Sequence, residues 1–114
     1  MKLFDVNDET KVINIKHGHD YDVYIGRGRC PKTGEFSIWG NPYSHIPGCG
    51  KYKVDNVNEA IEKYREYVLN NNYLMEQLPN LKGKILGCWC MPKNPIKGKL
   101  YCHGQVLIEI LNNL

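Results

Sequence analysis

The chain has 114 residues, of which 42% are hydrophobic and 24% are charged, and its formal net charge is +3 at pH 7. These values are typical of one soluble domain with a real hydrophobic core. The charge is weaker than the basic face of a dedicated nucleic-acid binder, so nucleic acid is only a weakly supported partner.

No apolar stretch approaches the ~18 residues of a membrane span, and the first ten residues lack the apolar run of a signal peptide. We therefore expect no membrane partner and a cytoplasmic location. Disulfides are disfavoured in that compartment, so the five cysteines are interpreted as free thiols or metal ligands. The odd count also argues against a fully paired disulfide framework.

Two short strands come first in the chain. Residues 11–16 (KVINIK) alternate apolar and polar side chains, as a half-buried strand does, and residues 23–27 (VYIGR) form a second β-prone run. Residues 26–50 are rich in glycine and proline and predict a long loop. A loop of that length inside a compact domain is usually functional or mobile, and we interpret this one as functional.

Two helices, a strand and a third helix are predicted next. Apolar residues recur at helical spacing across residues 55–71, where Asn56 and Glu59 resemble a capping box. Residues 73–81 predict a short helix that Pro79 helps to end. Residues 83–90 (GKILGCWC) are typical of a strand buried on both faces. Residues 104–114 carry the apolar stripe of a helix that packs on the sheet.

This order predicts a single α/β domain over residues 1–114, with one small sheet flanked by helices in a Rossmann-like three-layer arrangement. Ligands of such sheets bind beyond the carboxyl ends of the strands and beside helix N-termini. Three loops are expected to meet at that edge: residues 26–42, residues 88–92 and residues 101–104.

Three cysteines and a histidine form the first candidate site. In a strand, Cys88 and Cys90 would point to the same face. Cys102 and His103 from a neighbouring loop would then complete a Cys3His set for zinc. The spacing departs from the usual zinc-ligand pairs, and the adjacent ligands need a sharp bend that Gly104 allows. Packed thiols beside a capping histidine are the alternative without metal.

The same residues also fit a thiol enzyme. A cysteine at a helix N-terminus has its thiolate stabilised by the helix dipole and by a nearby imidazole, and Cys102 meets this description if the last helix begins near Gly104. Cys102 would be the catalytic nucleophile and His103 the catalytic acid or base.

A second constellation indicates a loop that binds an anion or a nucleotide. Its glycines allow a close approach of the backbone to a ligand, and its guanidinium groups suit phosphate or carboxylate. No P-loop or dinucleotide-binding glycine motif is present. With the start of the last helix included, the candidate ligand-binding residues are Gly26, Arg27, Arg29, Trp39, Gly40, Asn41 and Gly104.

The segments VYIGR, WGNP, AIEKYREYVL, LPNLKGKILGCWCMP and CHGQVL resemble an uncharacterised family, domain of unknown function 4326, over residues 11–111. The resemblance implies a compact α/β domain of bacteria, phages and large DNA viruses, with no assigned activity. Its pattern positions are Gly26, Arg27, Trp39, Gly40, Asn41, Pro42, Cys88, Trp89, Cys90, Pro92, Cys102, His103 and Gly104.

The chain departs from that pattern in three places. Residues 28–38 and residues 93–101 are longer than the corresponding stretches of the family. Gln105 stands where an acidic residue commonly follows CHG, which weakens any mechanism that needs a carboxylate there.

Three functions stay open. The first is a nucleotide- or nucleoside-phosphate-binding domain, with or without hydrolytic activity, in bacterial or viral conflict or signalling. There the arginines and the last helix would hold the phosphate of a small phosphorylated ligand, Trp39 would support the base or sugar, and His103 would be a polar contact. The second is a zinc-stabilised module that contacts protein or nucleic acid, and the third is the Cys102–His103 enzyme. A viral protein would act in the host cytoplasm.

Overall fold

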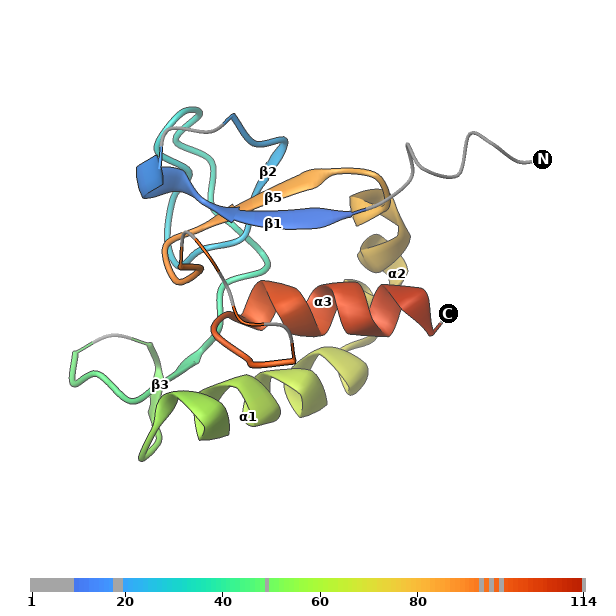
Figure 1. Cartoon of the computed structure of the whole chain (residues 1–114). Helices are drawn as coiled ribbons and strands as arrows, with labels where there is room; N and C mark the ends of the chain where they lie inside the picture. The colour runs from blue at the N-terminus through green and yellow to red at the C-terminus, as the bar shows by residue number, and fades with distance from the viewer. Residues whose placement is uncertain are drawn as a thin grey trace.

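The computed structural model describes residues 10–17, 20–48, 50–92, 94, 96 and 98–113. Figure 1 shows a small sheet above two long helices. The elements follow in the order β1 (Lys11–Asn14), η2 (Ile15–His17), β2 (Val23–Tyr24), β3 (Tyr43–Ser44), β4 (Tyr52–Lys53), α1 (Val57–Leu69), α2 (Asn72–Gln77), η3 (Leu78–Leu81), β5 (Ile85–Cys88) and α3 (His103–Asn112). This mixture of helices and strands confirms the predicted α/β class.

The main sheet has three parallel strands in the order β1-β5-β2. The central strand, β5, pairs with β1 from Lys11 opposite Ile85 to Asn14 opposite Cys88. Leu86 and Cys88 are fully buried, as the apolar run of this segment predicts. Because the strands are parallel, the loops that follow β2 and β5 begin at the same edge of the sheet.

A second sheet consists of β3 and β4, which are parallel, with Tyr43 opposite Tyr52 and Ser44 opposite Lys53. The prediction of a single sheet is therefore wrong. Strands of two residues carry too little alternation to be recognised in a sequence. β3 lies within the predicted loop of residues 26–50, and β4 follows directly after it. The Tyr43 and Tyr52 rings pack with centroids 5.1 Å apart.

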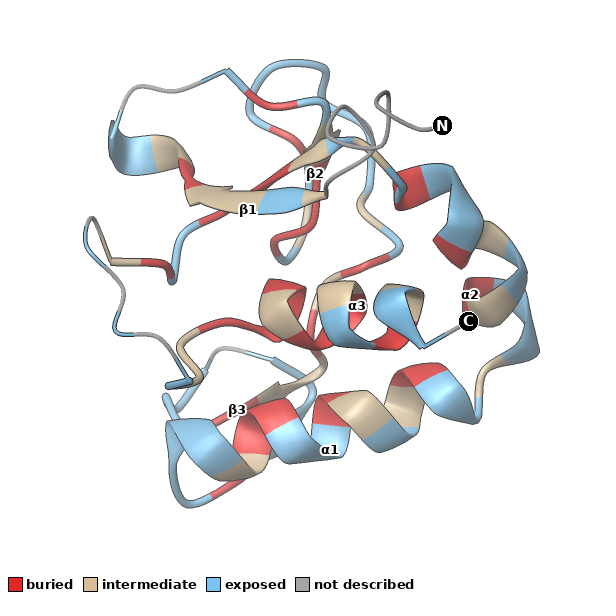
Figure 2. Ribbon diagram, turned by 45° about the vertical axis from the view of Figure 1, so that its right-hand side comes forward, coloured by how far each residue is buried: buried red, intermediate tan, exposed pale blue. Residues whose placement is uncertain are grey.

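α1 begins after the predicted N-cap, Asn56, although the reciprocal bond of a capping box goes to the residue before the cap. The side chain of Asn56 accepts a hydrogen bond from the backbone N–H of Glu59, and the Glu59 carboxylate accepts one from the N–H of Asp55. Both views of the chain place α3 between the main sheet and α1, so these two helices stack on one side of the sheet (Figures 1 and 2). A Rossmann-like arrangement, with helices on both faces, is not confirmed.

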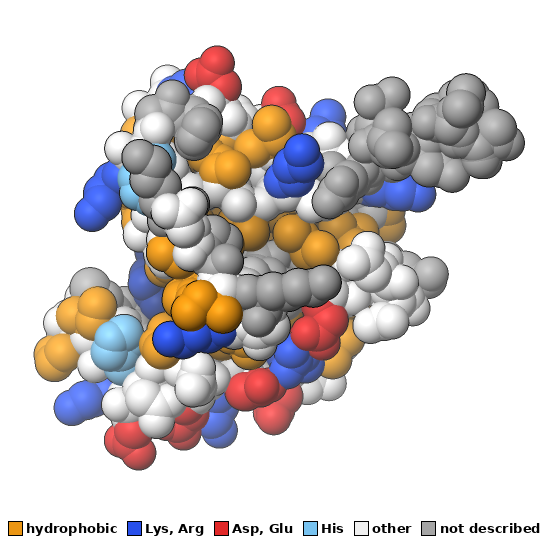
Figure 3. Space-filling model, in the orientation of Figure 1, with side chains coloured by type: hydrophobic (Ala, Val, Ile, Leu, Met, Phe, Trp, Pro, Cys, Tyr) orange, Lys and Arg blue, Asp and Glu red, His pale blue; other side chains and the backbone are white. Residues whose placement is uncertain are grey.

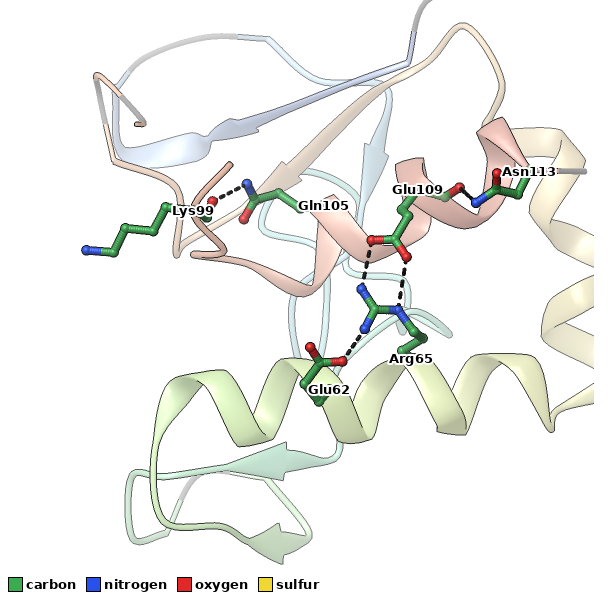
Figure 4. A network of polar contacts seen from close by, with 6 residues as sticks. All are labelled: Glu62, Arg65, Lys99, Gln105, Glu109 and Asn113. Carbon is green, nitrogen blue, oxygen red and sulfur yellow. Dashed lines mark hydrogen bonds and ion pairs between the residues drawn. The ribbon is translucent and has the colours of Figure 1, made fainter. Parts of the chain in front are cut away.

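An ion pair joins α1 to α3 at their solvent-facing side. Arg65 on α1 donates from Nε and Nη2 to the two carboxylate oxygens of Glu109 on α3, at 3.1 and 2.7 Å, and its Nη1 pairs with Glu62 (Figure 4). The two-pronged geometry fixes the helices side by side. Because the carboxylates are exposed, the pair contributes about 1 kcal/mol or less to the free energy of unfolding.

The outer face of α1 is a solvated surface. Acidic and basic side chains alternate along the lower edge of the molecule in Figure 3, where α1 lies. No helix among the described residues is long and apolar enough to cross a membrane.

Gly104 is predicted to be a packing position at the start of α3. A Cβ there would lie 2.7 Å from Cδ1 of Ile25 and 2.8 Å from Cγ2 of Val12. We expect Gly104→Ala to lower the free energy of unfolding in urea by about 1–2 kcal/mol, because α3 must move off the sheet. Alanine otherwise favours a helix over glycine by about 1 kcal/mol, so a gain in stability would contradict this packing. Exposed Asn58→Ala on α1 is the control, with a change within about 0.5 kcal/mol.

Candidate functional site

A cavity of about 90 Å³ lies where the N-terminus of α3 meets the loops that follow β2 and β5. The YIGR, WGNP, CWC and CHG segments all contribute to its wall. We call it the thiol cavity, and its lining residues are Arg27, Asn41, Ser44, His45, Ile46, Val57, Ala60, Ile61, Cys90, Tyr101, Cys102 and His103.

Three cysteines meet beside this cavity. Cys88 ends β5 and Cys102 precedes α3, and the Cys102 thiol donates to the Cys88 sulfur across 3.1 Å. Both sulfurs are buried. Cys90 lies just past the end of β5 and is exposed to solvent. The structure therefore brings the three predicted cysteines together but gives each a different environment.

The three thiols differ in their affinity for a proton. Hydrogen bonds with Cys88 and Cys90, together with burial, raise the pKa of Cys102 well above its ordinary value. The polar interaction with the neighbouring Cys102 and the nearby charge of Arg27 lower the pKa of Cys90 to about 6. At neutral pH, Cys90 is thus an exposed thiolate, while Cys102 stays a thiol whose proton is engaged with Cys88. This geometry favours Cys90 over the predicted Cys102 as a nucleophile.

His103 is held as a neutral imidazole. Its Nε2 lies 2.5 Å from the carbonyl oxygen of Ile25, so this nitrogen carries the proton and donates it. Its Nδ1 faces the Cys102 sulfur at 3.8 Å, and its ring packs edge-on against Tyr64. Burial lowers the pKa of His103 to about 4. At pH 7 the ring therefore offers a lone pair at Nδ1, and it fastens α3 to the end of β2.

The first turn of α3 has its own hydrogen-bond partners. The Cys102 sulfur accepts from the N–H of Gly104 at 3.4 Å, and the Cys102 carbonyl accepts from the N–H of Gln105 at 3.0 Å. In return, Oε1 of Gln105 accepts from the N–H groups of Tyr101 and Cys102, which completes a capping box. Its Nε2 donates to the carbonyl of Lys99 (Figure 4). The predicted binding of phosphate here would have to displace these contacts.

Arg27 and Asn41 fix the loop that borders the cavity. Arg27 donates from Nε to the carbonyl of Asn41 and from Nη2 to the carbonyl of Tyr43, each at 2.7 Å. The buried Asn41 amide donates to the carbonyl of Ala60 and accepts from the N–H of Tyr43. The hydrogen bonds of the described residues leave Nη1 of Arg27 without a partner. One cationic edge of this exposed side chain is therefore left for a ligand.

The other predicted ligand-binding residues lie elsewhere. The glycines are packing positions, because a Cβ at Gly40 would lie 3.1 Å from Cα of Arg27 and one at Gly26 would collide with the Tyr24 ring. Trp39 is buried and lines a different cavity. Arg29 donates to a loop carbonyl and lies over an exposed phenylalanine ring. The predicted set is thus divided between two places.

Zinc binding stays a prediction. Among the described residues, no group of three or more His, Cys, Asp or Glu side chains is placed to hold a metal ion. The 3.1 Å between the Cys88 and Cys102 sulfurs is also shorter than the about 3.8 Å between two thiolates on one tetrahedral zinc ion. The geometry is that of hydrogen-bonded thiols. Cys49 lies outside the described residues.

Three polar residues of the cavity wall were missed by the sequence reasoning. Ser44 and His45 come directly after WGNPY, and Tyr101 directly precedes CHG. Their only signal was adjacency to a motif. Ser44 is buried and accepts a hydrogen bond from the N–H of Ile46, while exposed His45 adds a second imidazole to the cavity.

The buried His103 predicts an acid-sensitive fold. Its pKa is about 4 in the folded chain and about 6.5 in an unfolded one, so protons bind preferentially to the unfolded state between these values. The stability that His103 contributes is therefore present above pH 6.5 and falls with the pH. We expect a loss of about 2 kcal/mol in the free energy of unfolding between pH 7 and pH 5.

The measurement is urea unfolding at both pH values, for the parent chain and for His103→Gln. The glutamine amide retains a donor for the Ile25 carbonyl but does not titrate. The parent chain should lose about 2 kcal/mol more than the variant on acidification. Equal losses would show that His103 is not held neutral.

A family model described as a domain of unknown function, DUF4326, matches residues 11–113. An uncharacterised protein of Acanthamoeba polyphaga mimivirus is 40% identical over 93 residues, which are 78% of this chain and 65% of that protein. The chain thus spans slightly less than two thirds of this viral relative. No solved structure matches the present chain. Since the family model covers almost its whole length, the chain belongs to the DUF4326 family.

Proposed function

We propose that the thiol cavity is the active site of a thiol-dependent enzyme that acts on a small anionic substrate, with Cys90 as the nucleophile. The observation that carries this proposal is the convergence of Cys90, Arg27 and Cys102 on one cavity from separate parts of the chain. Of the three alternatives drawn from the sequence, the thiol enzyme has the strongest geometric support, with the nucleophile moved from Cys102 to Cys90.

Among the cavity residues that belong to the family pattern, Cys90 has the least evident structural role. Cys102 caps α3, His103 joins α3 to β2, and Asn41 holds its loop against α1. The Cys90 side chain is exposed and does none of this. An exposed thiolate beside a guanidinium group is typical of a reactive rather than a packed cysteine.

The size and charge of the cavity restrict the substrate. About 90 Å³ is room for about three water molecules, the space of a phosphate or carboxylate group. The remaining edge of Arg27 supplies the cation for such a group. A nucleotide, the first alternative from the sequence, would place only its phosphate here, with base and sugar outside.

The chemistry that these residues support is nucleophilic displacement. The Cys90 thiolate attacks an electrophilic carbon next to the bound anionic group, forms a carbon–sulfur bond and releases the leaving group with its electron pair. The hydroxyl of a water molecule then bonds to that carbon, the carbon–sulfur electron pair returns to the Cys90 thiolate, and the released proton neutralises the departing group, so that the net reaction is hydrolysis. The nearby positive charge of Arg27 stabilises the Cys90 thiolate before the attack. A reducing cytoplasm would keep these thiols available.

Site-resolved alkylation tests the proposal on the whole chain. Iodoacetate and iodoacetamide differ in charge, and peptide mapping by mass spectrometry follows each cysteine. We expect Cys90 to react first, with a rate that rises through pH 6 and levels off above pH 7, as its lowered pKa requires. Arg27 should make iodoacetate several times faster relative to iodoacetamide at Cys90 than at Cys30, and inorganic phosphate should protect Cys90.

Arg27→Gln should remove the preference for iodoacetate, whereas Arg27→Lys, which retains the charge, should preserve much of it. Arg29→Gln is the matched control, because Arg29 does not line the cavity. A Cys90 that reacts no faster than Cys30, or that phosphate fails to protect, would contradict the proposal. Thiols that react only after a chelator removes one equivalent of zinc would instead support the zinc-stabilised module.

A further inference from the structure

A second and larger cavity lies between β2 and a hairpin. The hairpin is closed by the antiparallel bridge between Arg29 and Phe36 and by the hydrogen bond from the N–H of Cys30 to the carbonyl of Glu35, and it turns through Gly34 at φ +77°. The cavity has a volume of about 320 Å³ and shares no lining residue with the thiol cavity. We call it the hairpin pocket. Its volume falls in the range of sites for small organic ligands, unlike the thiol cavity.

Aromatic rings form much of the pocket wall. Tyr21, Tyr24 and Trp39 line it from nearly buried positions. Phe36, on the hairpin, is 67% exposed. Such a large apolar side chain in water gives the folded chain little stability. Arg29 lies over one face of the ring, 5.1 Å from its centre, which leaves the other face for a ligand.

The charged groups of the pocket favour a ligand with hydrogen-bond donors. Asp22 already accepts from the N–H of Ile85 at 2.8 Å, and Lys32 donates to the carbonyl of Tyr21 and lies 4.2 Å from the centre of its ring. Within the described residues, the Glu35 carboxylate makes no hydrogen bond. Both of its oxygens therefore remain open as acceptors in the wall of an aromatic pocket, whereas Asp22 has one oxygen already engaged.

We propose that the hairpin pocket binds a nucleoside whose base carries an amino group, with the base stacked on Phe36 and its N–H donors directed to Glu35. Aromatic side chains stack on the faces of nucleobases, and carboxylates accept hydrogen bonds from their amino groups. Guanine presents two adjacent N–H donors that match the two oxygens of a carboxylate, so guanosine is the strongest candidate. Uracil lacks an amino group and is the weakest.

The reactivity of Cys30 can report whether this pocket is occupied. Its sulfur lies 3.3 Å from the hydroxyl of Tyr21 and lines the pocket wall. The hydrogen bond from Tyr21 lowers the pKa of Cys30 to about 7, so part of it is a thiolate at neutral pH. A bound nucleoside would cover this sulfur and leave Cys90, which lines the other cavity, unprotected.

Equilibrium dialysis of the whole chain against guanosine and uridine tests the proposal, with the alkylation of Cys30 by iodoacetamide measured in the same samples. We expect saturable binding of guanosine, at least about tenfold tighter than that of uridine, and slower alkylation of Cys30 but not of Cys90. Phe36→Ala should weaken guanosine binding about tenfold through lost stacking. Glu35→Gln should weaken guanosine about tenfold and uridine little.

Tyr73→Ala is the matched control, because Tyr73 is an aromatic residue 56% exposed on α2, away from the pocket, and its removal should change nothing. Phe36 and Glu35 are both exposed, so their variants are expected to fold. Absence of saturable binding at millimolar guanosine would overturn the proposal, as would equal binding of uridine. Guanosine that protects Cys90 and is lost in Arg27→Gln would place the nucleoside in the thiol cavity instead.

Discussion

The arrangement of the site depends on the hydrogen bond from Nε2 of His103 to the carbonyl oxygen of Ile25. It ties the first turn of α3 to the end of β2 and fixes which ring nitrogen carries the proton. With the helix docked there, Gly104 lies against Ile25 and the Cys102 sulfur comes into contact with Cys88. Cys90 and Arg27 line the cavity beside this contact. A buried imidazole thus organises a cavity in which it need not transfer a proton.

The elements that could be predicted from the sequence are those that repeat a pattern over several turns or residues. α1 and α3 carry an apolar face at helical spacing, and β5 is an apolar run, so all three were located within a few residues. The pair β3 and β4 could not be found, because two-residue strands leave no period to detect. The N-cap of α1 was visible at Asn56, whereas the capping box of α3 has a cysteine at the cap, a residue that capping preferences do not single out.

The residues of the candidate site could be predicted from the sequence, but their roles could not. The motifs named the right residues, since Arg27, Asn41, Cys90, Cys102 and His103 meet in one cavity. Their roles depend on burial, which a sequence does not show. Cys88 at the end of β5 is buried, whereas Cys90, two residues later, is exposed, and this difference favours Cys90 as the reactive thiolate. The fold likewise sends Trp39 to a cavity that Arg27 does not line, so one predicted nucleotide site became two separate pockets.

The cap of α3 is made of sulfur, and this links the chemical state of the cluster to the integrity of the fold. The Cys102 sulfur accepts from the N–H of Gly104 while it donates its proton toward Cys88. Any reagent, oxidant or metal ion that takes up the lone pairs of this sulfur also withdraws the acceptor that begins the helix. The three cysteines therefore do not react as an isolated set of side chains. A chemical change at Cys102 also removes the N-cap of α3 and so lowers the stability of that helix.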